Sequence, residues 1–342
     1  MESKKENANK ISRKKFLNVF GSVVAGGSIV GVSGILLRKN STIQKKNVEQ
    51  GGLRVQQSQA TDSPYKLVSS FSVPDNIDCF EICDEKLIVA TQNKVYLYDR
   101  SGLLLNNFTV DNDVRDIAVE NNLIYVLYPF RIETYNLEGK WVQEWEACSP
   151  NSDYCQLAVT PDFVFVTDAA NKNICKYTVE GDFVTFIQSP NGFIIPSYTF
   201  GIAHIDGSIY CSNPGRHQVE NYSLDGKYIT AFGKAGGAAG LFCGCCNPVH
   251  LSFTSNGDII TSEKGNPRIS CYGQDGQFRS VLLDSKDLGG GNTAYDVKVQ
   301  QDRIYIAGKN LISTFQYDRV LAAVTSCAAC KVNCPLREGV LI

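Results

Sequence analysis

The fold is decided by residues 246–278, which read CNPVHLSFTSNGDIITSEKGNPRISCYGQDGQF. Short runs of β-branched and aromatic residues alternate there with the turn-forming pairs Asn256-Gly257 and Asp275-Gly276. Runs of this length between such pairs are typical of antiparallel strands joined by tight hairpins. We therefore expect one small antiparallel sheet here, and from residue 65 onward the chain carries no amphipathic helical pattern of useful length.

The same unit occurs repeatedly along the chain, marked by a tyrosine that is followed four positions later by glycine. Phe315 takes the tyrosine's place in a sixth, less regular copy, and the aromatic residues are 37, 42, 45, 50 and 43 positions apart. Because one four-stranded sheet cannot bury both of its faces, six of them must stack around a common axis. We therefore expect an all-β fold, a six-bladed β-propeller. The five regular pairs are Tyr98 and Gly102, Tyr135 and Gly139, Tyr177 and Gly181, Tyr222 and Gly226, and Tyr272 and Gly276.

Residues 246–278 also resemble an NHL repeat, in which a proline precedes an apolar strand and an Asn-x-Arg-Ile segment precedes an aromatic residue and an Asp-Gly turn. The matching residues are Asn247-Pro248, Asn266 to Ile269 and Asp275-Gly276, and the unit from Leu157 to Phe186 matches more loosely. The resemblance covers about residues 65–324 and implies a six-bladed propeller. It implies no particular reaction, because such propellers serve as enzymes, ligand-binding proteins and scaffolds.

Ring closure requires that one end of the chain completes the blade formed by the other end. The candidates for this outer strand are Tyr65 to Phe71 and Arg319 to Val324, of which we favour the first. We expect Trp141, Trp145 and the repeated tyrosines to pack between blades and not to stack on a cofactor.

The chain divides into four segments. They are an export signal or single-span anchor at residues 1–37, a flexible tether at 38–63, the propeller at 64–324 and a cysteine-rich tail at 325–342.

The first segment indicates export. Residues 16–37 hold 22 residues without a charge, enough to cross a membrane as a helix. Just before them, Ser12-Arg13-Lys14-Lys15-Phe16-Leu17 resembles the twin-arginine export motif, with lysine in place of the second arginine. An ordinary secretory signal or anchor is the alternative. We expect an extracytoplasmic protein, in the periplasm or at the cell surface, that an uncleaved segment 16–37 holds in the membrane.

The charge distribution excludes one class of partner. The chain has 33 Lys and Arg against 35 Asp and Glu, and residues 1–63 hold 11 basic and 4 acidic side chains. Subtraction leaves 22 basic and 31 acidic residues, a net charge of −9, for residues 64–342. Nucleic-acid binding needs clustered Lys and Arg, so we expect no nucleic acid and favour a protein partner.

Thirteen cysteines form two dense groups and several isolated positions. Cys243, Cys245 and Cys246 precede the fifth blade, and Cys327, Cys330 and Cys334 follow the last one. The tail spacing resembles the last three cysteines of a ferredoxin run, and a 4Fe–4S cluster needs four thiolates. We therefore predict an iron–sulfur cluster that the tail shares with a rim cysteine. We expect adjacent Cys245 and Cys246 to point in different directions, so that only one of them joins the site.

Three other interpretations of the cysteines remain open. A zinc site with four thiolate ligands fits the same residues, and disulfides suit an exported protein, with Cys148 and Cys155 as a candidate pair. Free thiols are the third alternative. The cysteines expected within strands are interpreted as small buried hydrophobic residues; these are Cys83, Cys175, Cys211 and Cys271.

A second candidate site lies where the inner strands of the propeller should begin. Aligning the repeats predicts that the channel wall starts at Phe80, Asp116, Gln156, Gly201, His250 and Asp296. Arg115, Asp116, His250 and Asp296 then form a polar ring at one mouth, either as a binding site or as hydrated structural groups. His204, His217 and His250 share no spacing, so the sequence does not predict a three-histidine zinc site.

Together these features favour an exported, membrane-tethered propeller that carries an iron–sulfur or other thiolate-bound metal and acts in electron transfer or redox partner binding. The alternative is a cofactor-free extracytoplasmic scaffold, stapled by disulfides, that binds a protein or ligand. A third function is that of a metal-dependent lyase or hydrolase that uses the channel residues. The sequence leaves open whether the protein is an enzyme.

Replacing Arg13 and Lys14 together with glutamine should leave a folded precursor in the cytoplasm, because the twin-arginine route recognises this pair. Cell fractionation measures the effect, and a variant with glutamine at Lys4 and Lys5 is the matched control. Unchanged translocation of the Arg13 and Lys14 variant, or export that persists without the twin-arginine machinery, contradicts the prediction.

Overall fold

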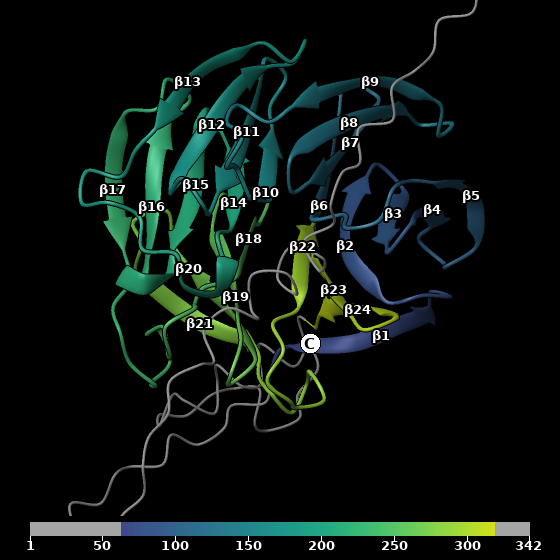
Figure 1. Ribbon diagram of the computed structural model, residues 1–342. Helices are drawn as coiled ribbons and strands as arrows, with labels where there is room; N and C mark the ends of the chain where they lie inside the picture. Colours follow the sequence, from purple (N-terminus) through teal and green to yellow (C-terminus); the bar gives the residue numbers. More distant parts are fainter. Residues whose placement is uncertain (1–62, 319–342) are drawn as a thin grey trace, which may run out of the picture. The chain divides into compact units, whose positions relative to one another are not determined.

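The computed structural model describes residues 63–318, which form six four-stranded antiparallel sheets around a central channel (Figure 1). The expected six-bladed β-propeller is therefore confirmed. Two 3-10 turns, η1 (Pro196–Tyr198) and η2 (Pro214–Arg216), are the helical elements of this part of the chain, and none of its helices is long and apolar enough to cross a membrane. The predictions for residues 1–62 and 319–342, the export segment, tether and cysteine tail, lie outside the described residues.

Each blade is a meander whose first strand is innermost. Blade 1 is β2 (Ile77–Cys83), β3 (Lys86–Thr91), β4 (Lys94–Asp99) and β5 (Leu104–Thr109); blade 2 is β6 (Asp116–Glu120), β7 (Leu123–Tyr128), β8 (Arg131–Asn136) and β9 (Trp141–Glu146). Blade 3 is β10 (Tyr154–Val159), β11 (Phe163–Asp168), β12 (Asn173–Thr178) and β13 (Phe183–Ile187); blade 4 is β14 (Ile202–Ile205), β15 (Ser208–Asn213), β16 (Gln218–Ser223) and β17 (Tyr228–Phe232). Blade 5 is β18 (His250–Phe253), β19 (Ile259–Glu263), β20 (Arg268–Tyr272) and β21 (Phe278–Leu283); blade 6 is β22 (Asp296–Gln300), β23 (Arg303–Gly308), β24 (Leu311–Tyr317) and β1 (Tyr65–Ser72).

The ring closes through β1, which pairs with β24 of the last blade from Tyr65 opposite Tyr317 to Ser72 opposite Leu311. This confirms that the N-terminal segment supplies the missing outer strand. The inner strands contact one another in order, and β22 contacts β2, so no blade is left with an uncovered inner edge (Figure 1).

Adjacent blades are joined by one repeated contact that explains the tyrosine and glycine of the sequence repeat. A large side chain from the outer strand of one blade lies over both residues in the next blade, where a glycine Cβ would collide with it. Ring centroids in four of these contacts are 4.9 to 6.2 Å apart, a distance at which aromatic pairs attract. The contacts are Phe71 with Tyr98 and Gly102, Phe108 with Tyr135 and Gly139, Trp145 with Tyr177 and Gly181, Ile187 with Tyr222 and Gly226, and Phe232 with Tyr272 and Gly276.

The two tryptophans differ in their surroundings. Trp145 is buried between blades, as expected, whereas the same expectation for Trp141 is wrong, since that side chain is 55% exposed. Trp141 begins the outermost strand β9 beside its hairpin turn, where its ring faces solvent.

A methyl group at Gly181 should weaken the propeller more than one at Gly207. Both glycines have positive φ, +99° and +76°, so each alanine variant loses about 1 kcal/mol to backbone strain. A Cβ on Gly181 would also lie 2.5 Å from Trp145, while nothing lies within 4 Å of one on Gly207. We expect Gly181→Ala to cost a further 1–3 kcal/mol in urea unfolding. Equal losses in the two variants would show that this interblade contact does not limit stability.

Candidate functional site

The channel mouth is formed by one equivalent position on each inner strand. In each blade this residue lies opposite the equivalent position of the second strand. The six residues are Cys79, Asp116, Gln156, Gly201, His250 and Asp296. The expectation that Phe80 belongs here is wrong, because the β2–β3 register shifts between Ile77 and Cys79 and moves the alignment by one residue. Phe80 is instead fully buried in the core.

Three of these polar side chains link neighbouring blades. Asp116 Oδ2 accepts a hydrogen bond of 3.0 Å from the Leu157 N–H, and Gln156 Oε1 accepts one of 3.2 Å from Ile202. Asp296 Oδ2 accepts the equivalent bond from Phe80, at 3.0 Å, across the closure of the ring. The rim residues are thus structural as well as polar, since each satisfies a backbone N–H of the next blade.

The interior just below the mouth concentrates charge around one ammonium group. Lys298 Nζ lies 2.9 Å from Glu81 Oε2, joining blade 6 to blade 1. Burial lowers the pKa of Lys298, but the carboxylates of Glu81, Asp296 and Asp116 outweigh it and raise the pKa overall. Burial raises the pKa of Asp116 to about 7, against the effect of Lys298 and with a contribution from Asp296. A carboxyl group with a pKa near 7 can donate or accept a proton at neutral pH.

His250 is held in one tautomer by its neighbours. Gln156 uses its Oε1 for Ile202, so its Nε2 faces His250 Nδ1 at 2.9 Å and donates to it. The imidazole proton therefore sits on Nε2, and Asp296 Oδ1 lies 3.7 Å from Nδ1. Burial lowers the pKa of His250, with Asp296 opposing and Lys298 assisting, which keeps the ring neutral near pH 7.

The other candidate rim residue, Arg115, has a different partner. Its Nη2 lies 3.9 Å from Asp153 Oδ1, in the loop that enters blade 3. Below the mouth the channel encloses about 260 Å³, lined by Glu81, His204 and Lys298 among others. His204 thus lines the channel and His250 lies at its mouth, whereas His217 lies elsewhere, beside the cysteine loop.

Glu81 and Lys298 are site residues that the sequence interpretation missed. Each lies two positions after a rim residue on the same inner strand, Cys79 and Asp296. Since side chains two apart in a strand share a face, this spacing was the signal that could have found them.

The cysteine loop before blade 5 brings two adjacent sulfurs together. Cys245 Sγ and Cys246 Sγ are 3.2 Å apart, so the expectation that these side chains point in different directions is wrong. Burial alone would raise the pKa of Cys246, but a hydrogen bond with Ser197, the Cys245 thiol and the Lys264 ammonium together lower it. The lowered pKa of Cys246 favours its thiolate.

Beside this loop lies a pocket of about 420 Å³ lined by His217, Cys243 and Cys245, among other residues. The buried Nδ1 of His217 has no hydrogen-bond partner, which is unusual for a buried polar atom. The tail cysteines Cys327, Cys330 and Cys334 lie outside the described residues.

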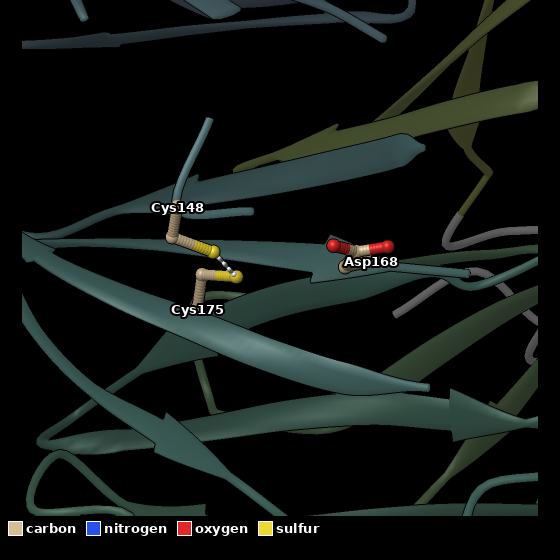
Figure 2. Close-up of side chains that lie close together, drawn as sticks. All are labelled: Cys148, Asp168 and Cys175. Atoms are coloured by element: carbon tan, nitrogen blue, oxygen red, sulfur yellow. Dashed lines mark hydrogen bonds between the residues drawn. The ribbon is translucent and has the colours of Figure 1, made fainter. Parts of the chain in front are cut away.

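A third cysteine site joins Cys148, Asp168 and Cys175, whose ligand atoms all lie within 4.8 Å of one another (Figure 2). The structure therefore pairs Cys148 with Cys175 and not with the expected Cys155, because β12 brings Cys175 beneath the loop after β9. Cys211 and Cys271 are buried as expected, while Cys83 is only partly buried.

Comparison with known proteins shows the fold. No family description and no curated protein matches this sequence. The structure is similar to that of a catalytically inactive virginiamycin B lyase from Staphylococcus aureus solved with quinupristin, with a TM-score of 0.53 and 13% identity over 74% of this chain and 99% of the lyase. A streptogramin B lyase structure has a TM-score of 0.54 and 15% identity over 76% and 99%. At these identities the likeness extends to the propeller architecture alone.

Replacing Asp116 with asparagine should change how stability depends on pH. An unfolded Asp titrates near pH 4, so between about pH 4 and pH 7 the folded protein holds a proton that the unfolded chain releases. The free energy of unfolding of the wild-type protein therefore falls as the pH rises from about 4 to about 7, relative to that of the variant. The asparagine of the variant still accepts the hydrogen bond from the Leu157 N–H. Urea unfolding at pH 5 and pH 8 should show a relative change of roughly 1–3 kcal/mol. The control is the exposed Asp162→Asn, and a pH-independent difference for Asp116→Asn would refute the shifted pKa.

Proposed function

We propose that this protein is an extracytoplasmic redox protein, held in the membrane by residues 16–37, that binds an iron–sulfur cluster through cysteine thiolates and exchanges electrons with a protein partner. The observation that carries the proposal is the pair Cys245 and Cys246, whose sulfurs are 3.2 Å apart and of which Cys246 favours the thiolate. Thiolates are the ligands of such clusters.

The residues of the loop fit a thiolate-bound metal in two further respects. A pocket of about 420 Å³ adjoins Cys243 and Cys245, and the wall of this pocket includes His217, whose buried Nδ1 has no hydrogen-bond partner. Within residues 63–318, this loop does not bring three metal-binding atoms close together. We therefore assign the remaining ligands to Cys327, Cys330 and Cys334. Zinc is the alternative metal for the same ligands.

Full-length protein purified without oxygen tests the proposal. We expect a brown protein with broad visible absorption, and iron and sulfide in matching amounts. Cys246→Ser and Cys330→Ser should each lose most of the iron, because the cluster needs four thiolates, while Cys83→Ser, at the end of β2, should keep it. Colourless wild-type protein without iron or sulfide contradicts the iron–sulfur proposal, and stoichiometric zinc in that protein assigns the site to zinc.

A second candidate function rests on the channel mouth. A neutral His250 beside Asp296, together with Asp116 whose pKa is about 7, is a pair of groups suited to moving protons at neutral pH. The structurally similar lyases make lyase or hydrolase chemistry the reaction class to test first.

Quinupristin, the compound present in one of those structures, is the first probe. If the channel is a lyase site of that kind, wild-type protein should consume quinupristin in a chromatographic assay, and His250→Ala should lose at least tenfold in rate. No consumption by wild-type protein removes this substrate. A metal-free protein without activity would then support the remaining function, a scaffold that binds a partner at its rim.

A further inference from the structure

The sulfurs of Cys148 and Cys175 meet at the junction of blades 2 and 3. The two Sγ atoms are 2.7 Å apart, between the length of a disulfide bond, about 2.05 Å, and an ordinary sulfur contact (Figure 2). Cys148 lies in the loop from β9 of blade 2 to β10 of blade 3, and Cys175 lies in the middle of β12. The residues are 27 positions apart, so a bond between them would close a loop of moderate length.

The nearby carboxylate of Asp168 is already engaged by four hydrogen bonds, which argues against a metal at this site. Asp168 Oδ1 accepts hydrogen bonds of 3.1 Å from the N–H groups of Asp153, Ala170 and Asn171, and Oδ2 accepts one of 2.8 Å from the Asn171 amide. These four donors use both acceptor positions of Oδ1 and one of the two on Oδ2, so a cation would have to compete for a carboxylate that already holds the loop. Asp168 is also fully buried.

The geometry points to a disulfide between Cys148 and Cys175 that ties the loop entering blade 3 to the third strand of that blade. This inference does not depend on the proposed redox site, because it uses other cysteines in another blade. The loop also carries Asp153, the partner of Arg115 at the channel mouth, so the bond would fix that side of the mouth.

The bond forms by two exchange steps with a protein disulfide or a small-molecule disulfide as oxidant. The Cys148 thiolate, on the partly exposed side, attacks the oxidant and releases its first thiol. The Cys175 thiolate then attacks the Cys148 sulfur and releases the second thiol, so the two cysteines lose two protons and two electrons and the oxidant gains them. Cys148 reacts first because Cys175 is fully buried, and burial, with the neighbouring Cys148 sulfur, raises the pKa of Cys175.

Peptide mapping of the full-length protein tests the inference directly. After equilibration with oxidised glutathione, acid quenching and alkylation, trypsin should leave residues 141–172 joined to residues 173–176, the mass being lower by two hydrogens than that of the two free peptides. A second cleavage after Tyr154 separates Cys148 from Cys155 and identifies the bonded sulfur. The cross-link should persist in Cys155→Ser and disappear in Cys148→Ser.

Thermal unfolding provides a second measurement. Reduction should lower the Tm of the wild-type protein and of Cys155→Ser by about 5–10 °C more than that of Cys148→Ser. A bond from Cys148 to Cys155, alkylation of both Cys148 and Cys175 after equilibration, or glutathione retained on Cys148 would each overturn the inference. So would a stoichiometric metal in the wild-type protein that Cys148→Ser alone removes.

Discussion

The propeller depends on one repeated contact, in which a large outer-strand side chain of one blade covers the tyrosine and glycine of the next. A blade is too thin to bury both of its faces, so its stability comes from its neighbours. The glycine allows close approach, and the tyrosine ring supplies the apolar area that the approach buries, as Trp145 does over Tyr177 and Gly181. Ring closure through β1 extends the same contact to the first blade through Phe71 and Tyr98.

At the channel mouth, residues that hold the blades together also carry the chemistry. Asp116 and Asp296 each accept a hydrogen bond from a backbone N–H of the next blade, and this contact keeps both carboxyl groups away from solvent. Desolvation then raises the pKa of Asp116, while Lys298 provides the compensating charge. Alignment of the repeats predicts Asp116 at the channel mouth, but the raised pKa of this group follows from its burial in the folded protein, which the sequence does not reveal.

The cysteines occupy three kinds of environment that their spacing alone does not separate. Cys211 is a buried core residue, Cys246 is a thiolate-favouring residue on a loop, and Cys148 meets Cys175 across a blade junction. Cys211 is a core residue because it is buried, and Cys246 favours the thiolate because hydrogen-bond donors and an ammonium group lie nearby. Cys148 meets Cys175 because the meander of blade 3 carries Cys175 to the blade junction. Dense clustering in the sequence singled out the loop as a candidate site, whereas it gave no indication of the pair 27 positions apart.

The architecture could be predicted from the chain alone, because strand length, hairpin turns and the period from one tyrosine to the next are local properties. The sequence also placed the closing strand near Tyr65. Which side chains meet depends on the folded ring: a register shift of one residue puts Cys79 in place of Phe80, and ring closure brings Lys298 to Glu81 across 217 positions. Such encounters depend on bulges and on the closed ring, which no local pattern encodes.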